Sequence, residues 1–192
     1  MGHSQSEKAQ SRERILSEAA DQVRAGGLES VSVGKLMRSV GLTHGGFYNH
    51  FESRADLIAW ALEYALVDGR KAWLVKDGQD DKPRSFETLV RKFLSRSHRD
   101  SRTTGCAVAA LASDVARSDD QSRAVMSRHI DDFVSQTGDS MPGHDKADAL
   151  LAVSAMVGAL LLSRVQVDPK ESDALLKLVR ERLLALNIVA TH

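Results

Sequence analysis

The sequence predicts an all-α protein, and three observations carry this prediction. Leu, Ala and Val dominate the composition, whereas aromatic residues make up 5% and prolines number three, a balance typical of helices rather than sheets. Apolar residues recur at spacings of three and four along most of the chain. Helix-starting and helix-stopping residues separate these periodic segments. The 192 residues suffice for one large domain or two small ones.

The beginning of the chain predicts two helices. After an N-terminal tail, residues 11–25 form an amphipathic pattern, because the apolar residues share one stripe and charged residues fill the rest. The adjacent Gly26 and Gly27 end that helix. Ser32 then caps a second helix, which Gly41 stops after about two turns.

A third short helix begins at Thr43 and turns Phe47 and Phe51 toward the core, four residues apart. Helix, glycine-containing turn and short helix over residues 32–51 predict a helix-turn-helix, and the first helix completes a three-helix core. A plain three-helix bundle predicts the same apolar pattern. The exposed face of the third helix therefore distinguishes the two.

That face carries polar side chains and glycine where an ordinary exposed helix has Glu, Lys, Gln and Ala. Glycine in a helix interior costs about 1 kcal/mol relative to alanine, so a reason outside local stability is expected. Hydroxyl, imidazole, amide and phenol groups bond to phosphates and base edges, and glycine lets a backbone approach DNA closely. The alternative is that the glycines only permit a tight turn and the histidines are solvated. The outward residues are Thr43, His44, Gly45, Tyr48, Asn49 and His50.

Charge supports this interpretation only locally. The chain has 26 Lys and Arg against 26 Asp and Glu, and residues 1–58 are likewise balanced. Between Ser32 and Arg54, however, Lys35, Arg38 and Arg54 are opposed only by Glu52. The predicted helix-turn-helix is therefore locally positive, as a nucleic-acid-binding surface requires.

A longer motif runs from the turn into the next helix: Gly, hydrophobic, two residues, Gly, one residue, Phe-Tyr, one residue, His-Phe, one residue, Ser-Arg, then Leu. The residues that form it are Gly41, Leu42, Gly45, Phe47, Tyr48, His50, Phe51, Ser53, Arg54 and Leu57. With its surroundings, residues 12–62, it resembles the TetR family of bacterial transcriptional regulators. The remainder of the chain matches that family only in helical character and length.

The resemblance implies an N-terminal helix-turn-helix DNA-binding head, residues 1–52, and a C-terminal helical effector-binding and dimerisation body, residues 53–192. It implies a cytoplasmic transcriptional repressor that binds a palindromic operator as a homodimer and is released by a small effector or by thiol modification. The expected partners are double-stranded DNA carrying an inverted repeat, a second copy of the chain and an unknown small-molecule effector. No cofactor, metal or membrane is expected.

Positions that match the family motif are expected to contact DNA. The residues expected in or beside the major groove are His44, Gly45, Gly46 and Tyr48, and those expected on phosphates are Lys35, Tyr48, His50 and Arg54. The family commonly has Thr, Ala or Ser where Gly46 stands, so one base contact is expected to be absent. The full set of DNA-binding candidates is Ser32, Lys35, Thr43, His44, Gly45, Gly46, Tyr48, Asn49, His50 and Arg54.

The body predicts further helices separated by charged or glycine-containing loops, the first loop at residues 76–84. Their expected starts are a capping box of Ser53 with Asp56, then Ser85, Thr103 or Thr104, and Ser118 with Gln121, followed by helices over 145–165 and 169–188. The apolar run 149–162 is shorter than the roughly 18 residues of a membrane span.

The last two helices carry complementary faces, a leucine stripe on one and small residues on the other. They either pack together within a subunit or, as the resemblance implies, form a four-helix dimer interface. The expected interface residues are Ala155, Gly158, Ala159, Leu176, Val179 and Leu183. The resemblance alone suggests an effector cavity, whose candidate walls, otherwise ordinary core, are Trp60, Tyr64, Phe93, Cys106, Met126, Phe133 and Met156.

Cys106 is the one cysteine, which excludes an intramolecular disulfide. A helix capped by Thr103 or Thr104 places it in the first turn, where the helix dipole lowers the pKa of a thiol. Its Gly-Cys context resembles the electrophile- and oxidant-sensing branch of the family, and Cys106 is the redox-sensing candidate. The alternative is a small buried apolar residue.

Hydrolase, nucleotide-binding and metalloprotease motifs are absent from the sequence, so we assign no catalytic residue and expect no enzyme. A cysteine-dependent enzyme using Cys106 with His98, and a helical scaffold that does not bind DNA, are the alternatives considered.

Overall fold

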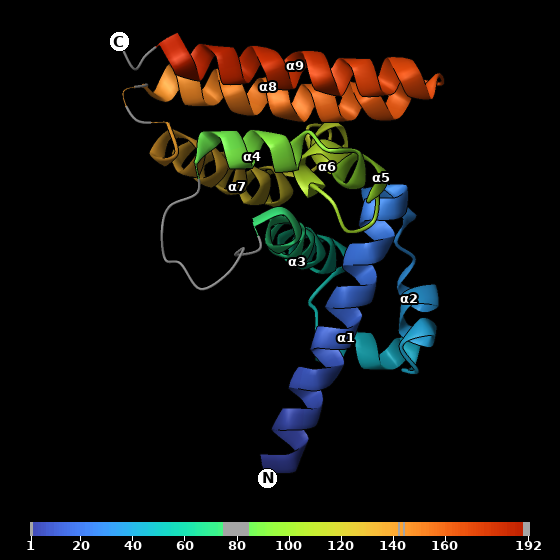
Figure 1. Cartoon of the computed structure of the whole chain (residues 1–192). Coiled ribbons are helices and arrows are strands. Elements are labelled where there is room, and N and C mark those ends of the chain that lie inside the picture. The colour runs from blue at the N-terminus through green and yellow to red at the C-terminus, as the bar shows by residue number, and fades with distance from the viewer. Residues whose placement is uncertain (1, 75–84, 142, 144, 190–192) are drawn as a thin grey trace.

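In a computed structural model, the described residues are 2–74, 85–141, 143 and 145–189, and they contain helices without a strand (Figure 1). The helices are α1 (Gly2–Gly26), η1 (Leu28–Ser30), α2 (Val33–Ser39), η2 (His44–Asn49), α3 (Arg54–Leu74), α4 (Phe86–Phe93), α5 (Arg96–Asp100), α6 (Ala107–Val115), α7 (Asp120–Asp139), α8 (Lys146–Val165) and α9 (Pro169–Val189). The prediction of an all-α fold is confirmed. The expected loop at 76–84 lies outside the described residues.

The head consists of α1, α2 and η2, with α3 leading into the body (Figure 1). The expected stripe of α1 is buried, and α2 and η2 turn Leu36, Met37 and Phe47 onto it. The prediction of an N-terminal tail before the first helix is wrong, because α1 already begins at Gly2. Glu7, Lys8, Ala9 and Gln10 are strong helix formers that continue the helix toward the N-terminus.

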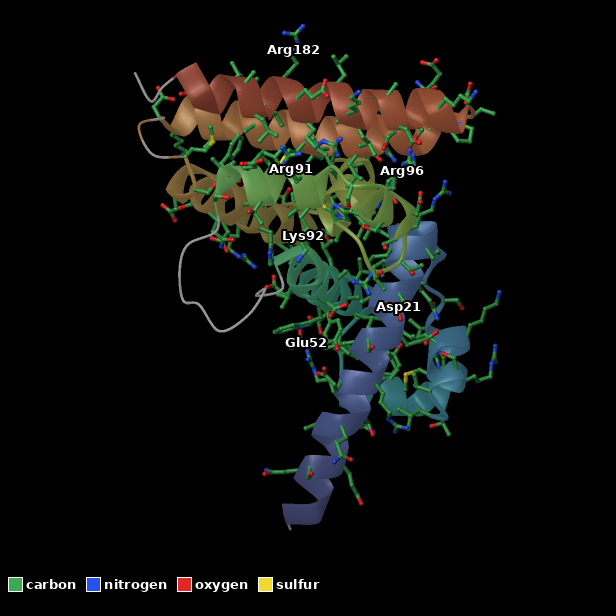
Figure 2. All side chains as sticks on the ribbon, in the orientation of Figure 1. Asp21, Glu52, Arg91, Lys92, Arg96 and Arg182 are labelled. Atoms are coloured by element: carbon green, nitrogen blue, oxygen red, sulfur yellow. The ribbon has the colours of Figure 1, made fainter. Side chains whose placement is uncertain are left out.

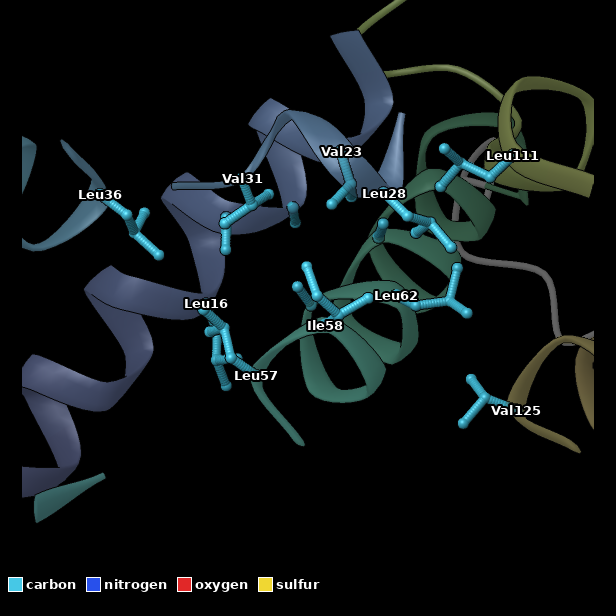
Figure 3. Close-up of a cluster of buried hydrophobic side chains, with 14 of the residues drawn as sticks. Leu16, Val23, Leu28, Val31, Leu36, Leu57, Ile58, Leu62, Leu111 and Val125 are labelled. Atoms are coloured by element: carbon cyan, nitrogen blue, oxygen red, sulfur yellow. The ribbon is translucent and has the colours of Figure 1, made fainter. Parts of the chain in front are cut away.

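One hydrophobic cluster joins the head to the body (Figure 3). It links Leu16 and Val23 of α1 and Leu62 of α3 to Leu111 of α6 and Val125 of α7. A boundary at residue 52 therefore cuts through one continuous core and stays a prediction. A second cluster fills the space between α4, α6, α7, α8 and α9.

Several predicted helix ends are confirmed and others are wrong. Ser53 accepts a hydrogen bond from the Asp56 backbone N–H at 3.0 Å, and Ser85 accepts one from Thr88 at 3.2 Å. The cap of α7 is Asp119 rather than Ser118, because the Asp119 carboxylate accepts the Ser122 N–H at 2.8 Å. Helix α5 was not expected, since its five residues contain no apolar repeat.

Helices α8 and α9 lie side by side as an outer layer over α4, α6 and α7 (Figure 1). Among the described helices, α8 alone has the length and apolar composition of a membrane span, and 39% of its most apolar window is buried inside the subunit. The inward side of this layer covers the second hydrophobic cluster.

Candidate nucleic-acid interface

The face of η2 predicted to point outward is exposed. Tyr48 is 69% exposed, and Thr43, His44, Gly45 and Asn49 are exposed beside it. On the opposite side Phe47 and Phe51 are buried, with ring centroids 5.6 Å apart. The division between inward aromatic and outward polar residues is thus confirmed.

The element is a 3₁₀ helix and not the α-helix that was expected. Thr43 is its N-cap as predicted, and its hydroxyl accepts the Gly46 N–H at 3.3 Å. Six residues with two adjacent glycines gain little from α-helical hydrogen bonding, and 3₁₀ geometry suits such short pieces.

The fold itself does not require the two glycines of η2. Positive φ among the described glycines occurs at Gly27, Gly41 and Gly143, and neither Gly45 nor Gly46 has it. A Cβ built on Gly45 meets nothing within 4 Å, and one on Gly46 meets Thr43 only at an ordinary 3.5 Å. Neither backbone conformation nor internal crowding therefore requires these two glycines, which argues against the alternative of a tight turn.

Helix α2 presents its candidates on the same side. Ser32 and Lys35 are exposed, and the Ser32 hydroxyl makes no capping hydrogen bond, so it is available to a partner. A Cβ on Gly34 would lie 3.6 Å from the His44 ring, which places that ring against α2. Hydroxyl, ammonium and imidazole groups from two elements thus converge on one surface.

Arg54 has a different role from the one predicted. Its guanidinium donates to the carbonyl oxygens of Val31 and Leu28, both at 3.2 Å, and pairs with Glu29 at 3.1 Å. These bonds fasten the start of α3 to the segment before α2. Arg54 is therefore a structural residue of the head rather than a free phosphate ligand.

His50 is half-buried and less available than expected. Its Nδ1 atom is buried without a partner among the described residues. Burial lowers the pKa of His50, and the charges of Lys8 and Arg12 lower it further. His50 is therefore neutral at pH 7, so a phosphate contact from it is a neutral hydrogen bond at most.

A family model described as bacterial regulatory proteins of the tetR family matches residues 15–60, the segment that contains α2 and η2. The match and the names of the relatives support a DNA-binding domain of the TetR family in residues 15–60. TetR regulators bind DNA and are not enzymes, so the chain is a DNA-binding transcriptional regulator.

Relatives extend the similarity along nearly the whole chain. An uncharacterized HTH-type transcriptional regulator of Mycobacterium tuberculosis is 27% identical over 189 residues, covering 91% of this chain and 94% of that protein. A TetR regulator of Chloroflexus aurantiacus, 25% identical, has a TM-score of 0.71 and covers 92% and 93% of the two chains. Reduced NemR of E. coli has the same TM-score with 13% identity, covers 91% and 95%, and shares the fold.

Three of the six residues predicted for the dimer interface lie inside the subunit. Ala159, Leu176 and Leu183 are each 3% exposed and belong to the second hydrophobic cluster. Their assignment to an interface is wrong, because the stripe packs on the body layer below. Ala155, Gly158 and Val179 are half-buried. The apolar residues on the outer side are Leu150, Leu151, Leu161, Leu162, Leu178 and Leu186.

The seven candidate pocket residues do not form one cavity wall. Met126 and Tyr64 belong to the cluster shared with the head, whereas Phe93, Cys106, Phe133 and Met156 belong to the other. Trp60 is 45% exposed near the head. Two pockets among the described residues lie elsewhere, around α5, and their shared lining is Ser95 and Ser97. Sequence reasoning missed them because α5 has no periodic signal.

Cys106 does not have the reactive environment that was expected. It is the N-cap of α6, is 3% exposed, and its backbone N–H donates to Nε2 of His98 at 3.0 Å. Burial raises the pKa of the thiol, so the prediction of a lowered pKa is wrong. The structure favours the alternative of a small buried residue.

His98 is held between two partners. Because Nε2 accepts from Cys106, Nδ1 carries the hydrogen and donates to the Phe93 carbonyl at 2.7 Å. Within the described part of the chain, His, Cys, Asp and Glu do not gather in a group able to hold a metal ion.

Proposed function

We propose that this TetR-family regulator is a cytoplasmic homodimeric repressor that binds an inverted-repeat operator and is released when a small molecule binds the body. The observation that carries the DNA contact is the exposed, glycine-containing polar face of η2, which the subunit itself does not need. The proposed base-reading residues are His44, Asn49 and Tyr48, and the proposed phosphate ligands are Lys35, Ser32 and Thr43.

The proposed dimer uses the outer side of α8 and α9. Leu151 and Leu162 of α8 and Leu178 of α9 are each 57% exposed. Arg182 projects from α9 away from the rest of the subunit (Figure 2). Exposed leucines on two long helices are costly in water, and a second copy of the chain would bury them.

The proposed release acts through contacts between body and head. The Asp114 carboxylate of α6 accepts the Leu28 N–H of η1 at 3.3 Å. A Cβ on Gly69 of α3 would approach the Gly105 carbonyl to 2.6 Å, so α3 and the start of α6 touch backbone to backbone. Any ligand that displaces α6 therefore also displaces elements that position η2.

The test combines mass and binding measurements. Light scattering of the full chain should give the mass of a dimer. Fluorescence anisotropy with fragments of its own promoter should identify an inverted repeat whose half-sites are about 34 Å, or a multiple of that, apart. Deleting one half-site should weaken binding strongly. A monomer that binds every fragment like random DNA would contradict the proposal.

A reporter placed behind that promoter tests the direction of regulation. Expression should fall when the regulator is produced and return when an inducing compound is added. Higher expression on production would instead indicate an activator.

A further inference from the structure

The head has few cations left for phosphates once its internal bonds are counted. Arg24 is buried and bonds to Asp21 at 2.7 Å, to Asp68 at 3.3 Å and to the Ala65 carbonyl. Arg54 is committed to η1, as described above. The remaining Lys and Arg residues before residue 59 are Lys8, Arg12, Arg14, Lys35 and Arg38.

Lys8 and Arg12 lie one turn apart on α1, so both project from the same side of that helix. The Arg12 guanidinium stands 4.5 Å from the Trp60 ring centroid and 5.0 Å from that of Phe51. It makes no hydrogen bond or ion pair within the described residues. Contact with ring faces fixes the guanidinium while its N–H groups stay available in the plane.

This side of α1 adjoins the end of η2. The charges of Lys8 and Arg12 both act on His50, the C-cap of η2, which places them within electrostatic range of it. In Figure 1 the N-terminal turns of α1 extend at the same end of the molecule as η2. The acidic neighbour Glu13 is engaged by the Tyr64 hydroxyl at 2.9 Å.

We infer that Lys8 and Arg12 form a phosphate-binding patch on α1, which contacts the DNA backbone beside the half-site that η2 reads. The ligand is the phosphodiester backbone of duplex DNA, recognised by charge and not by sequence. The patch adds contacts to the proposed operator complex, and its role there rests on that proposed function. The aromatic pair holds Arg12 in place before DNA arrives.

The experiment measures the salt dependence of DNA binding for variants of the full chain. Lys8→Gln should make the slope of log K against log salt shallower by about 0.9, and Lys8→Gln with Arg12→Gln by about 1.8. Affinity for promoter and random fragments should fall by the same factor. Arg12→Lys, which keeps the charge, should retain most of the slope.

Arg14→Gln is the matched control. Arg14 lies on the same helix but two residues past Arg12 and therefore on another side, where it donates to Ser11 at 3.4 Å. Its slope should equal that of the wild type. Because Lys8 is exposed, Lys8→Gln should melt like the wild type and stays informative even if Arg12→Gln unfolds.

The outcomes separate the two proposals. If Lys8→Gln and the wild type have equal slopes of log K against log salt on either fragment, the α1 patch is overturned. This holds whether or not the protein prefers its promoter to random DNA. Wild-type protein that binds random DNA as well as its promoter, with a slope that Lys8→Gln reduces, overturns the operator and supports the patch. Wild-type protein that binds neither fragment overturns both.

Discussion

The η2 element of the head and the α8–α9 pair of the body differ in what they leave exposed. η2 buries Phe47 and leaves the phenol of Tyr48 and the imidazole of His44 outside. The α8–α9 pair buries Leu183 and leaves other leucines, such as Leu178, outside. A polar unpartnered face matches phosphates and base edges, whereas an apolar one matches another apolar surface. The two regions therefore point to different kinds of partner.

The comparison also shows why the body is harder to interpret. η2 has one apolar side, which the subunit buries, and its polar side chains His44, Tyr48 and Asn49 are exposed. α9 has apolar residues on two sides, one toward the second hydrophobic cluster and one outward. Only the packing below α9 distinguishes the inner from the outer leucines.

Substituting an inner and an outer leucine of α9 gives the largest expected effect. Leu183→Asp should destabilise the subunit by at least about 3 kcal/mol, because it removes a buried leucine and buries a charge. Leu178→Asp should leave the subunit folded and weaken the dimer. Thermal melts and light scattering measure both. A folded monomer from Leu183→Asp would return Leu183 to the interface.

Substitutions of Arg54 and Lys35 compare a cation bonded within the head with a cation proposed to face DNA. Arg54→Ala should cost about 1–3 kcal/mol of stability, because the carbonyls of Leu28 and Val31 lose their donor. Lys35→Ala should leave stability unchanged and make the salt slope shallower by about 0.9. Denaturant melts and anisotropy titrations test the pair. An Arg54→Ala protein that melts normally but has lost one unit of slope would reverse the assignment.

These pairs indicate what could be predicted from the sequence. Helical periodicity located the long helices, and the polar chemistry of residues 43–50 predicted the exposed face of η2, because both are local signals. The bonds from Arg54 to Leu28, 26 positions apart, leave no local signal. The same holds for the contact between Arg12 and Trp60 and for the burial of Cys106. Such roles depend on tertiary packing, which composition and spacing do not encode.

Glycine substitutions sharpen the distinction between turn and contact surface. Gly45→Ala should leave the free energy of unfolding equal or raise it by up to about 1 kcal/mol, because the added Cβ has room and the φ of Gly45 is not positive. The melting temperature should therefore be equal or slightly higher. The substitution should nevertheless weaken operator binding about tenfold, or about 1.4 kcal/mol, because the added methyl keeps the backbone from the DNA.

Gly41→Ala is the opposite control. Gly41 has a φ of 73°, so alanine there should cost about 1–2 kcal/mol of stability through backbone strain. Its Cβ meets nothing within 4 Å, so strain and not a clash is the cause. Unchanged operator affinity in folded Gly45→Ala would leave the glycines of η2 without an explanation.

The smallest expected effect concerns a buried histidine of the body, His98, in contrast to His50 of the head. Burial is the main cause that lowers the pKa of His98, and its two ring nitrogens are already bonded in the neutral form. In the unfolded chain a histidine titrates near pH 6.5. Below that pH the unfolded chain therefore binds a proton that His98 in the folded chain does not bind, and the free energy of unfolding falls until the lowered folded pKa is reached.

The melting temperature should decrease from pH 7 toward pH 5. His98→Gln, although less stable throughout, should have a shallower decrease than the wild type. Because His50 is unchanged in that variant, its contribution cancels in the comparison. Parallel pH profiles for the two proteins would show that His98 is protonated as readily in the folded state as in the unfolded one.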